Sequence, residues 1–204
     1  MKFLIATLFT LTLFSCASPA QMASQTAPLM NGQEVDLDTI IKTSDNKEVM
    51  LKKVTKNKPS VLVFYRGGWC PYCNKQLSRL RKITKDIKKL GYQLIAVSPD
   101  KVSKFQETVK KHKLDYTLIS DSSLNLANNL NLTFKVDSKT RAIYKTYGIN
   151  LEEASGKKHH SLPIPAVYVI DSDGLIHFNY VNPNYKVRLN EKILLNALKE
   201  LKLK

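Results

Sequence analysis

Short apolar runs alternate with amphipathic stretches over most of the chain. Residues 60–65 (SVLVFY) form a β-branched and aromatic run after Pro59, as expected of a strand buried on both faces. Similar runs, each predicted to be a strand, occupy residues 92–97, 116–120, 165–170 and 175–181. The turn-forming tetrad DSDG separates the last two runs and predicts a hairpin.

Apolar positions at helical spacing follow the strands. The longest set ends where Gly91 stands in the place of a C-terminal glycine, and it predicts a helix of four to five turns; its members are Leu77, Leu80, Ile83, Ile87 and Leu90. A second helix starts near Ser98 or Asp100 and carries Val102, Phe105 and Val109. Asp121 can cap a short helix. A terminal helix is lined by Leu189, Ile193, Leu194, Ala197, Leu198 and Leu201.

This order of strands and helices predicts an α/β fold, with a central mixed β-sheet flanked by helices. Residues 35–204 contain no repeat, low-complexity tract or second linker. We therefore expect them to form a single domain.

The N-terminal residues 1–16 predict a signal peptide, with Lys2 before an apolar run too short to span a bilayer. The run ends in LFSC, which resembles the lipobox of a bacterial lipoprotein, so Cys16 is the expected lipidation site and membrane anchor. Phe14 is bulkier than that motif usually has, which leaves ordinary cleavage after Ala20 as an alternative. Either route predicts export. Residues 17–34, rich in Ala, Ser, Gln and Pro, are expected to be a flexible linker.

Composition and charge narrow the functional classes. Hydrophobic residues make up 43% of the chain and charged residues 24%, which excludes a disordered protein. The net charge of +15 raises the question of nucleic-acid binding, but the lysines are spread along the chain without an arginine-rich or aromatic-interleaved stripe. We expect a solvated basic surface and no nucleic-acid partner.

The candidate chemistry lies in Cys70 and Cys73, a C-x-x-C pair between a strand and a helix. Pro71 fits the first turn of that helix, so free backbone N–H groups and the helix dipole would stabilise a Cys70 thiolate, with Arg66 and Lys75 adding positive charge. Cys73 shares the apolar face of the helix. We therefore expect Cys70 to be an exposed nucleophile and Cys73 a shielded resolving thiol, with no cofactor and no metal.

The C-x-x-C pair has three other interpretations. A zinc half-site needs two more ligands, for which His159 and His160 are the only adjacent histidines. A purely structural disulfide closes too short a loop to restrain the unfolded chain strongly. The third interpretation is that both cysteines merely fill the core, but then their position beside Trp69 and at a helix start would have no explanation.

The segment at residues 64–73 (FYRGGWCPYC) resembles the active-site segment of the peroxiredoxin-like, AhpC/TSA-related branch of the thioredoxin superfamily. The likeness begins near Val35 and continues to the end of the chain, where residues 185–189 (YKVRL) are also similar. It implies a thioredoxin-like fold. Residues 162–171 (LPIPAVYVID) resemble the segment that carries the superfamily's cis-proline, which would place Pro165, after a cis bond, beside the cysteines.

The resemblance also bears on which thiol attacks. The peroxidatic cysteine of peroxiredoxins matches Cys73, and the Thr or Ser of their motif matches Cys70. The motif's proline falls at Arg66, and Pro165 takes the place of the arginine that completes the peroxide site.

These observations leave three functions open. The first is a thiol-disulfide oxidoreductase acting on disulfide-containing proteins on the extracytoplasmic side of a membrane. The second is a thiol peroxidase, with Cys73 attacking peroxide and Cys70 resolving. The third is a non-catalytic binding module. Both enzymes would need a thiol reductant.

Overall fold

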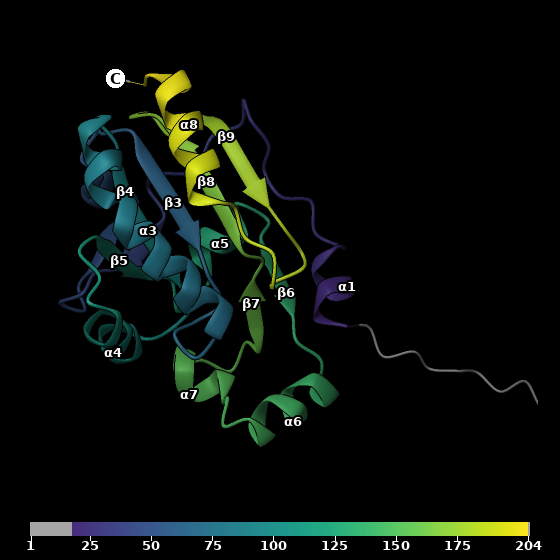
Figure 1. Cartoon of the computed structure of the whole chain (residues 1–204). Helices are drawn as coiled ribbons and strands as arrows, with labels where there is room; N and C mark the ends of the chain where they lie inside the picture. The colour runs from purple at the N-terminus through teal and green to yellow at the C-terminus, as the bar shows by residue number, and fades with distance from the viewer. Residues whose placement is uncertain (1–17, 204) are drawn as a thin grey trace, which may run out of the picture.

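A seven-stranded mixed sheet forms the centre of the part of the chain that the computed structural model describes, residues 18–203 (Figure 1). The strand order is β2-β1-β5-β4-β3-β8-β9. Its members are β1 (Ile40–Lys42), β2 (Glu48–Met50), β3 (Ser60–Phe64), β4 (Gln93–Ser98), β5 (Thr117–Ser120), β8 (Ala166–Ile170) and β9 (Ile176–Val181). The strands β3, β4 and β5 are parallel, and the others pair antiparallel to their neighbours. Strands β6 (Thr133–Lys135) and β7 (Ser161–Pro163) form a separate antiparallel pair.

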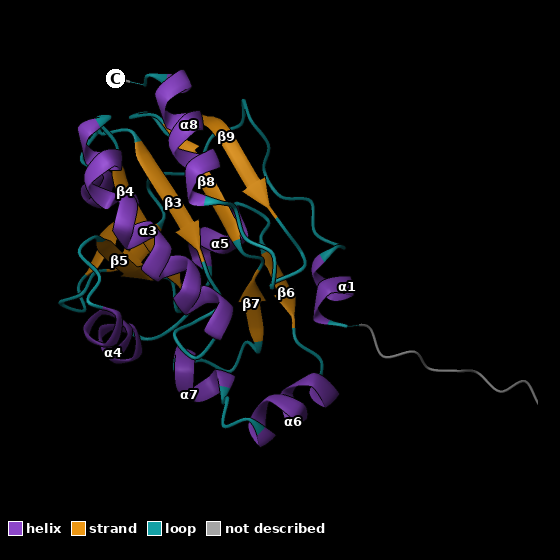
Figure 2. Ribbon diagram, viewed as in Figure 1, coloured by secondary structure: helices purple, strands orange, loops and turns teal. Residues whose placement is uncertain are grey.

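Helices cover both faces of this sheet, which explains why all five residues of β3 are buried (Figure 2). Val61 and Val63 face α3 (Pro71–Lys89) and α8 (Glu191–Leu201), whereas Leu62 and Phe64 face the opposite core. Successive side chains of β3 are therefore removed from water on alternate faces of the sheet. The remaining helices are α1 (Pro19–Ala23), α2 (Leu51–Thr55), α4 (Val102–His112), α5 (Asn125–Asn129), α6 (Ser138–Thr146) and α7 (Leu151–Ser155).

The α/β class and the mixed sheet are confirmed, and the five predicted strands agree with β3, β4, β5, β8 and β9 to within a residue at each end. The hairpin is also confirmed: Asp171 Oδ1 accepts hydrogen bonds of 3.0 Å from the N–H groups of Asp173 and Leu175. Asp121 accepts from the N–H groups of Leu126 and Ala127 at the start of α5, as its predicted capping role requires. Sequence patterns did not predict α1, β1, β2, α2, β6, β7, α6 or α7, which are all short.

The segment expected to be a flexible linker is structured from its second residue on. Ser18 caps α1 through a capping box, and Ala23 is 1% exposed in the main core. The N–H of Leu29 donates to the Leu130 carbonyl, and the N–H of Gly32 donates to the Ile176 carbonyl. The linker expectation is corrected for residues 18–34, because apolar side chains and backbone hydrogen bonds hold this segment to the domain.

The predicted signal peptide and Cys16 lie outside the described residues. Within residues 18–203, none of the helices has the length and hydrophobicity that crossing a bilayer requires.

Candidate active site

The C-x-x-C pair lies where the chain leaves β3 and begins α3. Cys70 is the N-cap of α3 in an extended conformation, and Pro71 occupies the first helical position, as predicted. Gly67 precedes the pair with a φ of 144°, and a Cβ there would collide with Trp69 Nε1 and Asp100 Oδ1. A glycine is therefore needed to bring the loop this close to its neighbours.

Both thiols are buried. Cys73 is fully buried, as the apolar face of α3 predicted, but Cys70 is only 1% exposed. The expectation of an exposed Cys70 is therefore wrong. Cys70 belongs to a core cluster with Tyr65, Leu77 and Phe105, against which the Trp69 side chain packs. The residues flanking the motif fold over its first cysteine, an effect that spacing along the sequence does not reveal.

The two cysteines differ strongly in acidity. Hydrogen bonding from the Cys73 thiol is the main effect lowering the pKa of Cys70, to about 6, and the charges of Arg66 and Arg188 add to it against the opposing effect of burial. Burial and the neighbouring Cys70 raise the pKa of Cys73. At neutral pH the pair therefore holds one thiolate, on Cys70, and one thiol, on Cys73.

Arg66 explains why an anion is stable in this site. Its side chain is 2% exposed, and its guanidinium carbon lies 4.2 Å from the centre of the Tyr185 ring, 5.1 Å from that of Trp69 and 5.5 Å from that of Tyr144. Arg66 Nη2 donates a hydrogen bond to the Tyr144 hydroxyl. Among the described residues no carboxylate lies within ion-pair distance of Arg66. A buried cation needs a counter-charge, and the Cys70 thiolate provides one.

A second guanidinium approaches from the other side of the pair. Arg188 Nη2 lies 3.4 Å from Cys73 Sγ, although 115 positions separate the two residues. Arg188 belongs to the segment between β9 and α8, whose YKVRL sequence carried part of the family resemblance. Sequence reasoning did not assign Arg188, Tyr144 or Tyr185 to the site. Only the YKVRL likeness could have pointed to two of them.

Asp100 holds the backbone of the cysteine loop. It follows β4, is 2% exposed, and its Oδ2 accepts a hydrogen bond of 2.7 Å from the Gly68 N–H. Burial raises the pKa of Asp100 to about 7. Gly68 also packs so closely against α4 that a Cβ would collide with Thr108 Oγ1. The carboxyl and the glycine together fix the approach of the chain to Cys70.

Pro165 lies between β7 and β8, at the sheet edge where β3 ends, because Ala166 pairs with Phe64. The predicted cis bond before it is wrong: no peptide bond among the described residues is cis. The Ile164 N–H donates to the Leu132 carbonyl, and the Pro165 carbonyl accepts from the Asn182 N–H, so both neighbouring strands hold the chain extended. The trans isomer is also the intrinsically favoured one. A role of Pro165 beside the cysteines remains a prediction.

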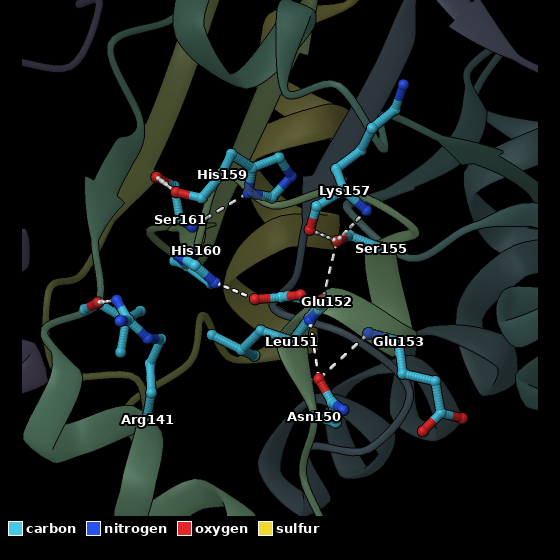
Figure 3. Close-up of polar contacts among 11 residues, drawn as sticks. Arg141, Asn150, Leu151, Glu152, Glu153, Ser155, Lys157, His159, His160 and Ser161 are labelled. Carbon is cyan, nitrogen blue, oxygen red and sulfur yellow. Dashed lines mark hydrogen bonds and ion pairs between the residues drawn. The ribbon is translucent and has the colours of Figure 1, made fainter.

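The side chains of His159 and His160 have partners other than the two cysteines (Figure 3). The Ser161 N–H donates to His159 Nδ1, so Nε2 carries the proton and donates to the Ser122 carbonyl at 3.0 Å. His160 pairs with Glu152 of α7. Residues 18–203 contain no cluster of three His, Cys, Asp or Glu side chains arranged to bind a metal ion.

The site thus combines a low-pKa thiol at a helix start, a buried partner thiol and two arginines in a thioredoxin-like fold. A family model described as the AhpC/TSA family matches residues 25–179, well over half of the chain. The chain therefore belongs to the AhpC/TSA family.

Individual relatives agree with this assignment. The chain is 30% identical over 142 residues to the chloroplastic peroxiredoxin Q of Triticum aestivum, an alignment that covers 70% of this chain but 55% of that protein. It is 26% identical over 157 residues to the putative peroxiredoxin bcp of Coxiella burnetii, covering 76% and 89% of the two chains. The chain thus spans little more than half the length of the plant relatives.

Solved structures of peroxiredoxins share the fold. Peroxidoxin BcpB from Mycobacterium tuberculosis superposes with a TM-score of 0.65 at 18% identity, covering 85% of this chain and 98% of that one. A cysteine-to-serine mutant of peroxiredoxin 6 from Arenicola marina gives a TM-score of 0.68 at 20% identity, covering 85% and 74%. At these identities the likeness establishes the thioredoxin-like architecture.

Proposed function

We propose that this protein is a thiol peroxidase in which Cys70 and Cys73 cycle between a dithiol and a disulfide. The observation that carries the proposal is the buried Arg66, whose charge lacks a carboxylate partner among the described residues and favours a thiolate on Cys70. Peroxide reduction needs such a thiolate, together with donors that stabilise the departing oxygen. Membership of the AhpC/TSA family, and similarity to proteins named peroxiredoxins, support the same activity.

In the proposed cycle the Cys70 thiolate attacks one oxygen of a hydroperoxide. The O–O bond breaks, an S–O bond forms, Cys70 becomes a sulfenic acid, and the departing alkoxide takes a proton from water. The Cys73 thiol then attacks Cys70 sulfur, which forms the disulfide and releases water. An external thiol reductant supplies the two electrons and two protons that restore the dithiol. The charges of Arg66 and Arg188 would stabilise the departing oxygen.

The order of attack proposed here differs from the order that the family motif implies. Position in the motif assigns the peroxidatic role to Cys73, but burial and the Cys70 thiolate hold Cys73 in the protonated form. The thiolate is the nucleophilic form of cysteine. We therefore assign the attack to Cys70 and the resolving step to Cys73.

Variants of the full-length protein in which one cysteine of the pair is replaced test this assignment. With hydrogen peroxide and a dimedone probe, Cys73→Ser is expected to accumulate a sulfenic acid on Cys70, whereas Cys70→Ser is expected to react at least tenfold more slowly. Rapid oxidation that survives Cys70→Ser and is lost in Cys73→Ser would reverse the assignment. Slow peroxide consumption by the unmodified protein would refute the proposed peroxidase activity.

Thiol-disulfide exchange with other proteins is the second candidate function. The contrast between a low-pKa Cys70 and a buried, protonated Cys73 also suits attack on a protein disulfide followed by resolution. Insulin reduction with dithiothreitol, compared between the unmodified protein and Cys70→Ser, measures it directly. Failure of both this assay and the peroxide assay would favour a non-catalytic binding module.

We propose that the protein is exported and held at the extracytoplasmic side of a membrane by a lipid on Cys16. The support is the sequence of residues 1–16, with its positive start, apolar run and LFSC ending. Because α1 begins at Pro19 and packs on the domain, such an anchor would hold the domain close to the bilayer. Labelling with palmitate in cells, lost in Cys16→Ser, tests the lipid. Cleavage after Ala20 without lipid would contradict it.

A further inference from the structure

A groove beside the cysteine pair contains three cations that the proposed cycle does not use. It lies between the first half of α3 and the segment that leads from β9 into α8, and its volume is about 170 Å³. Four cations line it, and one acid accompanies them: Lys75, Arg79, Lys186, Arg188 and Glu191. Tyr72, Leu80 and Leu189 supply apolar surface.

Three of the four cations in this groove form no ion pair with the residues that the structure describes. Among the described residues, Lys75, Arg79 and Lys186 form no ion pair within 4.0 Å, and Glu191 pairs with none of them. Elsewhere on the surface several lysines are paired, for example Lys52 with Asp38 and Lys104 with Glu153. Unpaired like charges gathered around a concave surface raise the local concentration of anions.

Buried polar atoms in the groove are also unsatisfied. Gln76 is 6% exposed and lines the groove, yet its Oε1 has no hydrogen-bond partner; Arg188 Nε and Glu191 Oε2 are likewise buried and unpartnered. Buried polar groups without partners are uncommon in folded proteins. Arg188 Nε is the one donor among these three atoms, so an anion in the groove would meet a guanidinium N–H that the protein itself leaves unsatisfied.

Arg188 connects the groove to the cysteine pair. This side chain lines the groove and also places Nη2 3.4 Å from Cys73 Sγ. Arg79 lies six residues beyond Cys73 on α3, which corresponds to about 9 Å along the helix axis. A molecule whose reactive atom reaches the cysteines can therefore place an anionic group among the cations while its carbon chain crosses Leu80 and Leu189.

We infer that this groove binds the carboxylate end of an organic molecule that reacts at the cysteine pair, either a hydroperoxide or a reducing thiol. A carboxylate matches the forked guanidinium donors of Arg79 and Arg188, and the apolar lining matches a hydrocarbon chain. The inference rests on the proposed redox function and adds a substrate class to it.

The test compares full-length protein with the double variant Arg79→Gln, Lys186→Gln. The matched control is Lys82→Gln, Lys85→Gln, which removes the same charge from exposed positions of α3 that do not line the groove. In the peroxide arm the substrates are linoleic acid hydroperoxide and its methyl ester. In the thiol arm the reductants are 3-mercaptopropionate and 2-mercaptoethanol.

We expect the groove variant to raise KM about tenfold for the carboxylate-bearing compound in at least one arm, with little change for its neutral counterpart. The arm that responds identifies the ligand as the peroxide or the thiol. Equal effects on charged and neutral compounds, no effect on either, or the same effect in the control variant would overturn the inference.

A measurement without turnover separates this inference from the proposed peroxidase. Octanoate is expected to slow alkylation of Cys70 by iodoacetamide more than octanol does, and the groove variant is expected to lose that protection. Such protection in a protein that reduces no peroxide would keep the carboxylate site and refute only the peroxidase. Peroxidase activity without this protection, and without carboxylate selectivity in either arm, would keep the proposed peroxidase and refute the carboxylate site.

Discussion

Arg66 Nη2 donates a hydrogen bond to the hydroxyl of Tyr144, a contact between the loop after β3 and helix α6. This contact holds a buried guanidinium beside Cys70 from a helix that the sequence pattern did not predict. The acidity of the cysteine therefore depends on a residue 74 positions away in the sequence.

Removing the Arg66 charge should make Cys70 less acidic. In Arg66→Met, we expect the pKa of Cys70 to rise from about 6 to about 7, because one of the two nearby positive charges is lost. Tyr144→Phe should give a smaller rise, since it keeps the charge and removes only its tether. Thiolate absorbance at 240 nm against pH measures both, with exposed Arg81→Met as control. An unchanged titration in Arg66→Met would show that Arg66 is not the counter-ion.

The reaction of Cys70 should follow this titration. Below pH 6, its rate with iodoacetamide is expected to rise about tenfold for each pH unit and to level off above pH 7, because only the thiolate reacts. Cys73→Ala should shift the profile to higher pH, since the Cys73 thiol is the main hydrogen-bonding partner of the thiolate. Cys73→Ser should shift it less, because a hydroxyl can also donate. A profile that in the unmodified protein rises only above pH 8 would contradict the proposed thiolate.

Asp100 should make the protein less stable as pH rises. Its pKa is about 7 in the folded state and near 3.8 ordinarily, so between these values the folded protein binds more protons than the unfolded chain. The free energy of unfolding therefore falls from pH 4 to pH 7. Asp100→Asn keeps an acceptor for the Gly68 N–H and should be more stable than the unmodified protein at pH 8, by about 2 kcal/mol.

Urea unfolding at pH 4 and pH 8 checks this prediction. The advantage of Asp100→Asn should vanish at pH 4, where the native carboxyl is already protonated. Asp115→Asn, which changes an exposed carboxyl, serves as the control. Equal effects of the two substitutions at both pH values would refute the role of Asp100 burial.

Gly68 should tolerate no side chain while Thr108 is present. The Cβ of Gly68→Ala would collide with Thr108 Oγ1, so we expect a loss of about 1–3 kcal/mol in stability and slower Cys70 alkylation. Thr108→Ala removes the colliding atom. The double variant should therefore recover most of the loss, as urea unfolding would show. Additive losses in the double variant would mean that the close approach is not the cause.

Helix α1 should contribute to stability through Ala23. A carboxylate at this 1% exposed position would be buried without a partner, so Ala23→Asp is expected to cost about 1–3 kcal/mol. Gln25→Asp places the same group at an exposed position and should have little effect. Thermal unfolding compares the two. Equal melting temperatures would restore the view of residues 18–34 as a loose linker.

The sequence by itself determined the α/β class, the buried strand β3, the helix that follows Cys70 and the position of the C-x-x-C pair at its start. These features are local: alternation and helical spacing select strand or helix, and Pro71 after Cys70 marks the helix start within a few residues. The eight short elements that escaped prediction, α1 among them, span only three to nine residues each, too few for a clear period.

The tertiary structure alone decided the burial of Cys70, the trans bond before Pro165 and the surroundings of the thiolate. Tyr144 and Tyr185 pack against Arg66, and Arg188 reaches Cys73, all from segments far along the chain. Charge effects depend on such distances in space. Burial likewise depends on which segments cover a residue, so no spacing within the motif could reveal that its first cysteine is enclosed. The C-x-x-C pattern located the two cysteines, and the packing around them made Cys70 the more acidic thiol, chiefly through the hydrogen bond from Cys73 and further through the charges of Arg66 and Arg188.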